Sequence, residues 1–424
     1  MKNFFQILIF IIYNILLSAI FLILFIPLSI FLIIKKHNLS KRLGLTKLNL
    51  NKDKKTIWFH CASMGELNVF YSIFHNIKKN YDYNIVVTTT SITGYNKAKT
   101  LYKEADAITL LPFDIPFLII PFILRIKPDI LILIETELWP NLIFFSKLFK
   151  SKITLINARL SRKNFRKYYK IKFFWDFIIS KIDLIIAKSL TDEKKFNKII
   201  NQKINSFVIE NIKNASLYYK IKHTKSKLNF KPNNKPNKSD FVICFGSIRE
   251  KEENDIIDII KELVKENITV IFAPRHLSRL KHIEKKLINK NLTFDLFSSN
   301  NYNNKLILID TMGILLELYK ISNIAFVGGT LYNYGGHNIL EPVLNNTPVL
   351  YGPYTSNCTN EKKLIEHFNC GIKITNRSQL LEKLLFFYSN EEELQQYRLN
   401  INKLLLLLEK TNKEITENIK NLLP

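Results

Sequence analysis

The hydrophobic and polar residues of this chain form three successive patterns. From Phe4 to Ile34 the sequence is almost unbrokenly apolar. From residue 37 short apolar runs alternate with stretches of helical periodicity, and the same alternation begins again at Phe241. Alternating strands and helices are typical of a parallel sheet with helices on both faces. The 424 residues are enough for two such domains and an accessory segment, so we predict an α/β protein with two doubly wound domains.

The apolar runs of strand character are each followed by polar or small residues. In the first half they are Thr56–His60, Asn84–Thr88, Asp129–Ile134, Lys152–Ile156 and Asp183–Ala187. In the second half they are Phe241–Phe245, Ile268–Phe272, Leu306–Ile309, the run that includes Phe326 and Val327, and Pro348–Tyr351. Ligands of open α/β sheets bind beyond the carboxyl ends of the strands. The residues that follow these runs are therefore the candidates for function.

Composition sets the predicted domain boundaries. Two prolines and a run of Asn and Lys between residues 229 and 239 indicate a linker. Beyond residue 378 the pattern is helical, and Leu404–Leu408 predicts a helix that packs back onto the core. The predicted parts are a membrane anchor at 1–36, a first domain at 37–228, the linker at 229–239, a second domain at 240–405, and a C-terminal helix at 406–424.

The apolar N-terminal segment is long enough to cross a bilayer, which takes about 20 residues as a helix. Basic residues cluster directly after it, whereas only Lys2 precedes it. The positive-inside rule then places the body of the protein on the cytoplasmic side. The alternative is a helix that lies in the membrane interface or re-enters at Pro27.

The first candidate for chemistry is Glu66, in the stretch His60-Cys-Ala-Ser-Met-Gly-Glu66. A carboxylate at the start of a helix is stabilised as the anion and can accept a proton. The alternative is that Ser63 and Glu66 form a capping box without chemistry. Helical periodicity follows at once, with the apolar residues Leu67, Phe70, Phe74 and Ile77 on one face.

Two further strand ends carry charged side chains. Glu135 and Glu137 come directly after an all-apolar strand and are followed by Trp139-Pro140. Two buried carboxylates are costly and need donors or cations nearby. The next strand end offers Arg159 within Asn157-Ala-Arg-Leu-Ser-Arg162, although a solvated loop would explain that stretch equally well.

The stretch from Phe326 to Pro342 contains two glycine pairs and then His337, Asn338 and Glu341. Glycines let the backbone approach a ligand closely, and free amides at a helix start attract phosphate. This pattern predicts a nucleotide pocket. The simpler alternative is that the glycines only close a turn.

The net charge of +26 indicates a negatively charged partner, although an A+T-rich genome would also enrich Lys, Asn and Ile. The charge is dispersed and forms no nucleic-acid recognition motif, which disfavours nucleic acid as that partner. The four cysteines have no metal-ligand spacing and indicate reduced thiols. They are Cys61, Cys244, Cys358 and Cys370.

Taken together, the motifs resemble the Kdo transferases of lipopolysaccharide synthesis, which move deoxy-manno-octulosonic acid (Kdo) from CMP-Kdo onto a lipid A precursor. The resemblance covers nearly the whole chain. It rests on six motifs in the family's order: His60-x-x-Ser-x-Gly-Glu66, Glu135-Thr-Glu-Leu-Trp-Pro-Asn141, Asn157-Ala-Arg-Leu-Ser161, Pro274-Arg-His276, Asp310-Thr-Met-Gly313 and Gly335-Gly-His-Asn-x-Leu-Glu341.

The resemblance implies a GT-B glycosyltransferase with two Rossmann-like domains facing a central cleft. The acceptor would bind to the first domain and the donor to the second. It implies an inverting reaction without metal or cofactor, an anionic lipid A precursor as acceptor, and an anchor in the inner membrane with the catalytic body on the cytoplasmic side. These expectations would explain both the apolar N-terminus and the basic charge.

The family's site residues also have counterparts here. The catalytic base corresponds to Glu66. Transition-state stabilisers correspond to Glu135 or Glu137 and to Lys213. The CMP contacts correspond to Pro274, Arg275, Met312, Gly313, Ile314, Asn338, Ile339, Leu340 and Glu341.

The chain departs from the family pattern at two places. Ile314 replaces an acid after Met-Gly, and the segment before Lys213 lacks the family's glycine. The alternatives are a GT-B enzyme for another nucleotide sugar and a non-catalytic protein of the membrane surface.

Overall fold

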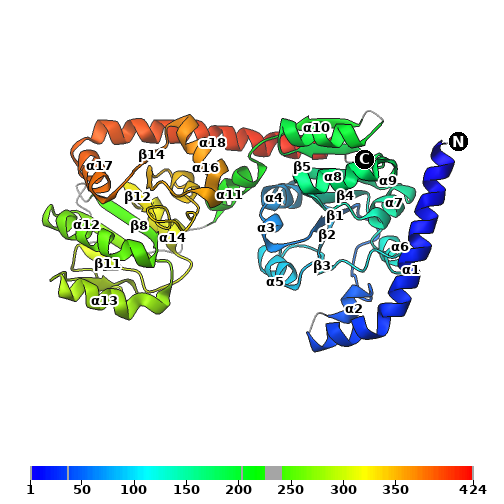
Figure 1. The fold of residues 1–424 in the computed structure, drawn as a ribbon, viewed down its shortest axis with the longest axis horizontal. Coiled ribbons are helices and arrows are strands. Elements are labelled where there is room, and N and C mark those ends of the chain that lie inside the picture. The colour runs from blue at the N-terminus through cyan, green and yellow to red at the C-terminus, as the bar shows by residue number, and fades with distance from the viewer. Residues whose placement is uncertain (1, 36–37, 202–203, 225–240, 423–424) are drawn as a thin grey trace. The chain divides into compact units, whose positions relative to one another are not determined.

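The computed structural model describes residues 2–35, 38–201, 204–224 and 241–422, and the chain folds into two compact units (Figure 1). Unit 1 comprises Met1–Lys220 and Leu408–Pro424, and unit 2 comprises Ile221–Leu407. The segment 229–239, which the sequence predicts to be a linker, lies outside the described residues. We describe each unit by itself.

Unit 1 contains a seven-stranded sheet in the order β3-β2-β1-β4-β5-β6-β7, and every neighbouring pair is parallel. Its strands are β1 (Thr56–Cys61), β2 (Asn84–Thr89), β3 (Ala107–Leu110), β4 (Ile130–Ile134), β5 (Lys152–Ala158), β6 (Leu184–Ala187) and β7 (Asn205–Val208). Its helices are α1 (Lys2–Ile34), α2 (Leu39–Arg42), α3 (Met64–Leu67), α4 (Tyr71–Asn80), α5 (Ile92–Leu101), α6 (Pro116–Ile126), α7 (Pro140–Leu148), α8 (Arg162–Lys170), α9 (Lys172–Ile179), α10 (Leu190–Ile199) and α11 (Ile212–His223).

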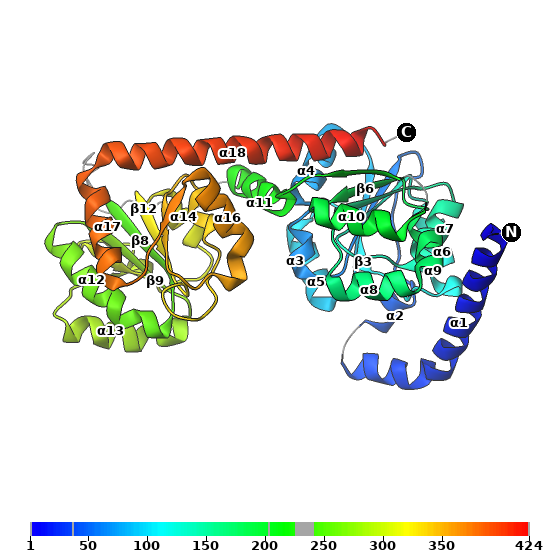
Figure 2. The ribbon, with the colours of Figure 1, turned by 45° about the horizontal axis from the view of Figure 1, so that its top comes forward.

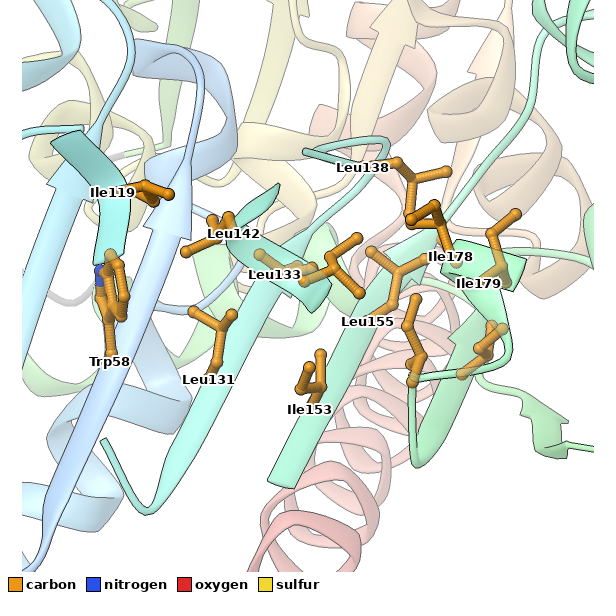
Figure 3. Packing of buried hydrophobic residues seen from close by; sticks show 14 of the residues in the cluster. Trp58, Ile119, Leu131, Leu133, Leu138, Leu142, Ile153, Leu155, Ile178 and Ile179 are labelled. Carbon is orange, nitrogen blue, oxygen red and sulfur yellow. The ribbon is translucent and has the colours of Figure 1, made fainter. Parts of the chain in front are cut away.

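Alternate side chains of the central strands enter two separate cores, because successive residues of a strand point to opposite faces. Trp58, Leu131 and Leu133 lie on one face, in a core with residues of α6, α7 and α9 such as Ile119, Leu142 and Ile178 (Figure 3). Phe59 and Ile132 pack on the other face against α4. The central strands are buried on both faces, which explains why β4 is apolar throughout and β1 is apolar apart from Thr56 and His60.

Unit 2 contains a second parallel seven-stranded sheet in the order β10-β11-β9-β8-β12-β13-β14. Its strands are β8 (Val242–Ile248), β9 (Thr269–Pro274), β10 (Asp295–Leu296), β11 (Leu306–Leu308), β12 (Ile324–Val327), β13 (Val349–Tyr351) and β14 (Gly371–Lys373). Its helices are α12 (Glu253–Lys265), α13 (Leu280–Asn289), α14 (Leu315–Lys320), α15 (Leu340–Leu344), α16 (Thr359–Phe368) and α17 (Arg377–Ser389), with short 3-10 turns at Glu250–Glu252, Leu277–Arg279, Phe297–Ser299 and Ser356–Cys358.

The prediction of two doubly wound α/β domains is confirmed, and every predicted strand is present to within a few residues. The four strands that the pattern does not predict are β3, β7, β10 and β14, which are the edges of the two sheets. Edge strands have fewer neighbours to bury them. Accordingly β7, β10 and β14 contain no fully buried residue and lack an apolar run.

The helix predicted after Glu66 is two helices, α3 and α4, and the prediction of one continuous helix is wrong. The hydroxyl of Tyr102 donates to the carbonyl oxygen of Leu67. That carbonyl would otherwise accept the amide of Tyr71 in a continuous helix. The apolar face predicted for this segment is nevertheless buried, as Phe70 and Phe74 show.

Helix α1 is the one described helix long and apolar enough to cross a membrane, by length and composition. One stripe of it packs against unit 1. Phe10 lies 4.4 Å from the ring of Phe144, and Gln6 donates to the carbonyl oxygen of Phe173 at 3.2 Å. Most other apolar side chains of α1 are exposed, so α1 is available to a bilayer while it remains attached to the domain.

Helix α18 (Glu391–Lys420) belongs to unit 2 up to Leu407 and to unit 1 from Leu408 (Figure 2). In unit 1 Asn412 donates to the carbonyl oxygen of Ala215 at 2.7 Å, and Ile415 and Ile419 enter the core that contains Phe74. Within the predicted buried run Leu404–Leu408, Leu406 is 66% exposed, so only part of that run is buried.

Candidate active site

Three carboxylates follow neighbouring strands of unit 1. Glu66 lies on α3 after β1, and Glu135 and Glu137 follow β4. Strands β1 and β4 pair directly, so their carboxyl ends share one edge of the sheet. The charges interact, because Glu135 and Glu137 both raise the pKa of Glu66. The structure therefore brings the predicted base and the predicted stabilising acids together.

Glu66 is held by two short contacts from the preceding turn. Its carboxylate accepts the amide of Ala62 at 2.7 Å and the hydroxyl of Ser63 at 3.0 Å. Ser63 accepts no amide of α3, so the reciprocal capping box is not formed. The Ser63 hydroxyl instead orients the acid.

Burial raises the pKa of Glu66, and the charges of Glu137 and Glu135 add to that rise. Together they outweigh the two hydrogen bonds, which lower the pKa, and the pKa of Glu66 is about 7. The expectation that a helix start would stabilise the anion is therefore wrong in its net effect. Helix α3 has only four residues and contributes little dipole. A carboxylate with a pKa near neutrality is a stronger base than an ordinary glutamate and still loses its proton near pH 7.

Glu137 is surrounded by donors. Trp139 Nε1 donates to Glu137 Oε2 at 2.8 Å, and Thr90 Oγ1 lies 3.5 Å from the same oxygen. His60 Nε2 lies 3.3 Å from it, and His60 is completely buried. Burial raises the pKa of Glu137, but these donors outweigh it and lower the pKa overall. Glu137 is thus an anion at the pH where Glu66 titrates.

Glu135 is held in the left-handed region, with φ of 61°, and its partner Asn157 at the end of β5 has φ of 55°. Arg159 Nη2 pairs with Glu135 Oε2 at 2.6 Å, and Asn157 Nδ2 donates to Glu135 Oε1 at 3.3 Å. Such backbone geometry is costly for residues other than glycine and is concentrated at functional sites. The predicted loop cation Arg159 therefore has a defined position beside the acids.

Lys213 lies in the first turn of α11, after the edge strand β7. Its side chain is exposed and makes no ion pair or hydrogen bond with the described residues. Strands β5 and β6 separate β7 from β4. No described contact joins Lys213 to the carboxylates, and its role stays a prediction.

Helix α8 begins at the strand end that positions Arg159. Phe165 and Tyr168 pack against the core of unit 1. The other face carries exposed cations with no ion pair to any described residue, namely Arg162, Lys163, Arg166, Lys167 and Lys170. Such a face is suited to an anionic surface.

In unit 2, cationic and imidazole side chains gather at the carboxyl ends of β8, β9 and β12. Pro274 ends β9, and Arg275 follows it with an exposed side chain. Arg249 Nη1 lies 2.9 Å from His276 Nε2, and its guanidinium stacks 4.5 Å from the ring centre of Tyr334. Burial and then the charges of Arg275 and Arg249 lower the pKa of His337 to about 4. The neighbourhood is positive and favours an anion.

The glycine loop after β12 is anchored by Glu252, which has no exposed surface. Its carboxylate accepts the amides of Gly329, Thr330 and Leu331 at 2.7, 3.1 and 3.0 Å, and that of Arg249 at 2.9 Å. Burial raises its pKa and the four amide bonds oppose that rise. The two loops that carry Arg249 and His337 are therefore tied to one acid.

The remaining predicted donor residues lie on nearby strand ends. Asn338 Nδ2 donates to Glu341 Oε1 at 3.3 Å, and Asn338 Oδ1 accepts the amide of Leu340 at 3.2 Å, beside the buried Ile339. Helix α15 has only five residues, so its dipole adds little to the charge of Arg275. The loop after β11 exposes Met312 and leaves open space around Gly313, whose φ is 87°. Ile314 is the N-cap residue of α14.

Three side chains with contacts in these two clusters are not among the predicted site residues. His60 stands inside a predicted motif, but its contact with Glu137 depends on strand pairing. Glu252 and Arg249 looked like ordinary residues at the start of a helix. The neighbours of an acid in the sequence do not show whether it is buried or solvated. The acidic cluster that directly follows the strand ending at Ile248 is nevertheless a sequence signal that indicates Glu252.

Comparison with known proteins agrees with this geometry. A family model for 3-deoxy-D-manno-octulosonic-acid transferase (kdotransferase) matches residues 37–216. A 3-deoxy-D-manno-octulosonic acid transferase of Aquifex aeolicus is 33% identical over 356 residues, which are 82% of this chain and 90% of that protein. A bifunctional glycosyltransferase/methyltransferase of Fusobacterium nucleatum is 33% identical over 91% of this chain, which spans only 61% of that protein.

Among solved structures, a UDP-GlcNAc 2-epimerase of Neisseria meningitidis bound to UDP-GlcNAc has a TM-score of 0.57 at 15% identity, covering 86% of this chain and all of that one. That similarity concerns the fold alone. The fold and the site define a protein of two Rossmann-like domains with the GT-B architecture. On the strength of the Aquifex relative, the chain belongs to the Kdo transferase family of glycosyltransferases, which acts in lipopolysaccharide synthesis.

Proposed function

We propose that this protein transfers Kdo from CMP-Kdo to a phosphorylated lipid A precursor, with inversion at the anomeric carbon and without a metal ion. The observation that supports this most strongly is the set of three carboxylates on one sheet edge, in which the pKa of Glu66 rises to about 7 while that of Glu137 is lowered. Two acids with separated proton affinities can take two different roles.

Glu66 acts as the base. Its ionised carboxylate takes the proton of the acceptor hydroxyl, whose oxygen forms a bond to the anomeric carbon of Kdo. The bond between that carbon and the phosphate oxygen breaks, and its electron pair leaves with CMP. Attack from the face opposite the leaving group inverts the centre, and the proton ends on Glu66.

Glu137 and Glu135 stabilise the positive charge that develops on the sugar ring. Glu137 is suited to this because its donors keep it ionised. Glu135 is fixed by Arg159 and Asn157. Fixed charges aimed at a developing charge need no reorganisation during the reaction. We assign Lys213 a supporting role as a stabiliser, on the resemblance alone.

CMP binds to unit 2. Arg275 faces the phosphate, whose negative charge grows as CMP leaves, and Arg249 reinforces the positive field. Glu341 accepts the ribose hydroxyls. The other contacts are Pro274, Met312, Gly313, Ile314, Asn338, Ile339 and Leu340, with Ile314 offering its backbone because it lacks a polar side chain.

The acceptor lies in the cytoplasmic leaflet of the inner membrane. Helix α1 supplies the apolar attachment, and the cationic face of α8 attracts the phosphates of the precursor and the anionic lipid surface. The partners are thus an anionic glycolipid and a membrane, and not nucleic acid.

The test is transfer from CMP-Kdo, generated in place, to a tetra-acylated lipid A precursor, followed by mass spectrometry. Wild type should add Kdo, and kcat/KM should rise with pH through about 7 as Glu66 loses its proton. Glu66→Gln should lose at least about 100-fold in kcat, the scale of a general base. Glu104→Gln, at an exposed acid of the same unit, should match wild type. An active Glu66→Gln would refute the assignment of the base.

A further inference from the structure

We propose that His60 is a positioning residue of the transfer reaction: its Nε2–H keeps Glu137 ionised beside the catalytic base, and Thr88 fixes the imidazole tautomer that allows this. The proposal rests on the proposed function, in which Glu66 is that base. His60 touches neither substrate nor the reacting atoms and acts through Glu137.

The geometry joins two strands behind the sheet edge. His60 ends β1 and is completely buried. Its Nδ1 lies 2.9 Å from Thr88 Oγ1 on β2. Its buried Nε2 has no well-aligned hydrogen-bond partner among the described residues and lies 3.3 Å from Glu137 Oε2 after β4. Strand β1 pairs with both β2 and β4, so the imidazole bridges the three central strands.

The tautomer follows from the partners of Thr88. Trp58 Nε1 donates to Thr88 Oγ1 at 2.8 Å, which leaves the hydroxyl hydrogen to be placed. That hydrogen can go to His60 Nδ1 at 2.9 Å or to the carbonyl oxygen of Phe59 at 3.5 Å. The shorter contact is the stronger hydrogen bond. With Nδ1 as the acceptor, the ring N–H is at Nε2, on the side of Glu137.

Without this donor, Glu137 would lose its ionised form more easily. Burial raises the pKa of Glu137, and the contact from His60 comes first among those that lower it. The charge of Glu137 in turn raises the pKa of Glu66. His60 therefore acts on the base indirectly, through Glu137. If Glu137 were neutral, Glu66 would be a weaker base. The positive charge that develops on the sugar would also lose one of the carboxylates that stabilise it.

The charged and acidic groups described near Glu137 do not take the place of His60. Glu66 and Glu137 repel each other, and Arg159 is already paired with Glu135. Burial raises the pKa of the Cys61 thiol and of the Tyr168 hydroxyl, so both are neutral. Trp139 and Thr90 also donate to Glu137 Oε2, at 2.8 and 3.5 Å, so His60 is one of three side chains that face this oxygen.

Two substitutions separate this role from simple filling of the core. In His60→Gln the amide nitrogen can occupy the place of Nε2 and donate to Glu137. In His60→Asn the shorter side chain can reach Thr88 but not Glu137. Both variants lose the ring, so a purely structural role would affect them alike.

The experiment measures kcat and KM for Kdo transfer from pH 5.5 to 9 with wild type and both variants. His60→Gln should keep the midpoint of the acid limb and stay within about tenfold of the wild-type kcat. His60→Asn should lose roughly 10- to 100-fold in kcat with KM unchanged, and its midpoint should fall by about half a pH unit or more, because the charge that raises the pKa of Glu66 is weakened.

Equal profiles for His60→Gln and His60→Asn, with the wild-type midpoint in both, would refute the role of His60 and leave the proposed function intact. A wild type that transfers no Kdo would instead remove the proposed function, and this proposal with it. If His60→Asn is poorly folded, Thr88→Val is a second test, because it removes the hydroxyl that fixes the imidazole tautomer. If a folded Thr88→Val keeps the wild-type midpoint of the acid limb of the pH profile, that result would also contradict the proposal.

Discussion

Glu252→Gln should loosen the glycine loop of unit 2 without unfolding the unit. In wild type one carboxylate oxygen accepts the amides of Thr330 and Leu331, and the other accepts those of Gly329 and Arg249. A glutamine offers one acceptor oxygen and turns an NH2 group toward the second pair of donors. At least two amide bonds to a buried charge are therefore lost.

The magnitude follows from those two bonds. A hydrogen bond to a charged group contributes about 1.5–3 kcal/mol, and Glu252 is fully buried, so no discount for solvent applies. The lower value for two bonds is about 3 kcal/mol, which corresponds to roughly a 100-fold larger population of the open loop.

Hydrogen exchange followed by mass spectrometry measures this population directly, because exchange of protected amides reports local opening. Peptides that cover residues 328–341 should exchange roughly 100-fold faster in Glu252→Gln. Glu250→Gln is the matched control, since Glu250 is an exposed neighbour whose ion pair within the described part of the chain is with Arg279, and its loss should leave the loop unchanged. Exchange in Glu252→Gln within about threefold of wild type would show that the amides do not depend on the carboxylate.

Two further predictions test the donor and membrane assignments. Arg275→Gln should raise the KM for CMP-Kdo about 10- to 100-fold by removing a charged contact to phosphate. The control Arg279→Gln, which removes an ion pair with Glu253, should leave this KM unchanged. Equal KM values in the two variants would contradict the donor assignment. Lys167→Glu on α8 should weaken binding to vesicles containing anionic lipid about tenfold at low salt and less at high salt. Lys363→Glu, at an exposed lysine of unit 2, should bind as wild type does, and equal loss in both would make the attraction non-specific.

The sequence predicts the strands well where both faces of the sheet are buried. Strands such as β1 and β4 are mostly apolar because both of their faces are buried, and this pattern can be recognised in the sequence. The edge strands lack this constraint and were missed. The break between α3 and α4 was also invisible, because it depends on a hydroxyl of Tyr102 that lies far from Leu67 in sequence.

The sequence predicts which residues lie at the candidate site, but it does not predict the hydrogen bonds and charge contacts between their side chains. Glu66, Glu135 and Glu137 follow strands, and parallel topology alone brings them to one edge. Their proton affinities depend on side chains from other strands, above all His60 and Thr90, whose contacts exist only once β1, β2 and β4 are aligned. Burial, which sets the pKa of Glu66, is likewise a property of the assembled unit.

Because α18 contributes to both units, it affects how the protein folds during translation. Ile415 and Ile419 complete the core beside Phe74, yet the ribosome makes them only after the whole of Ile221–Leu407. At about 5–20 residues per second, that interval lasts roughly 10 to 40 seconds. During this time the core of unit 1 that contains Phe74 lacks Ile415 and Ile419. A ribosome that stalls before Leu408 leaves unit 1 without the part of α18 that completes this core.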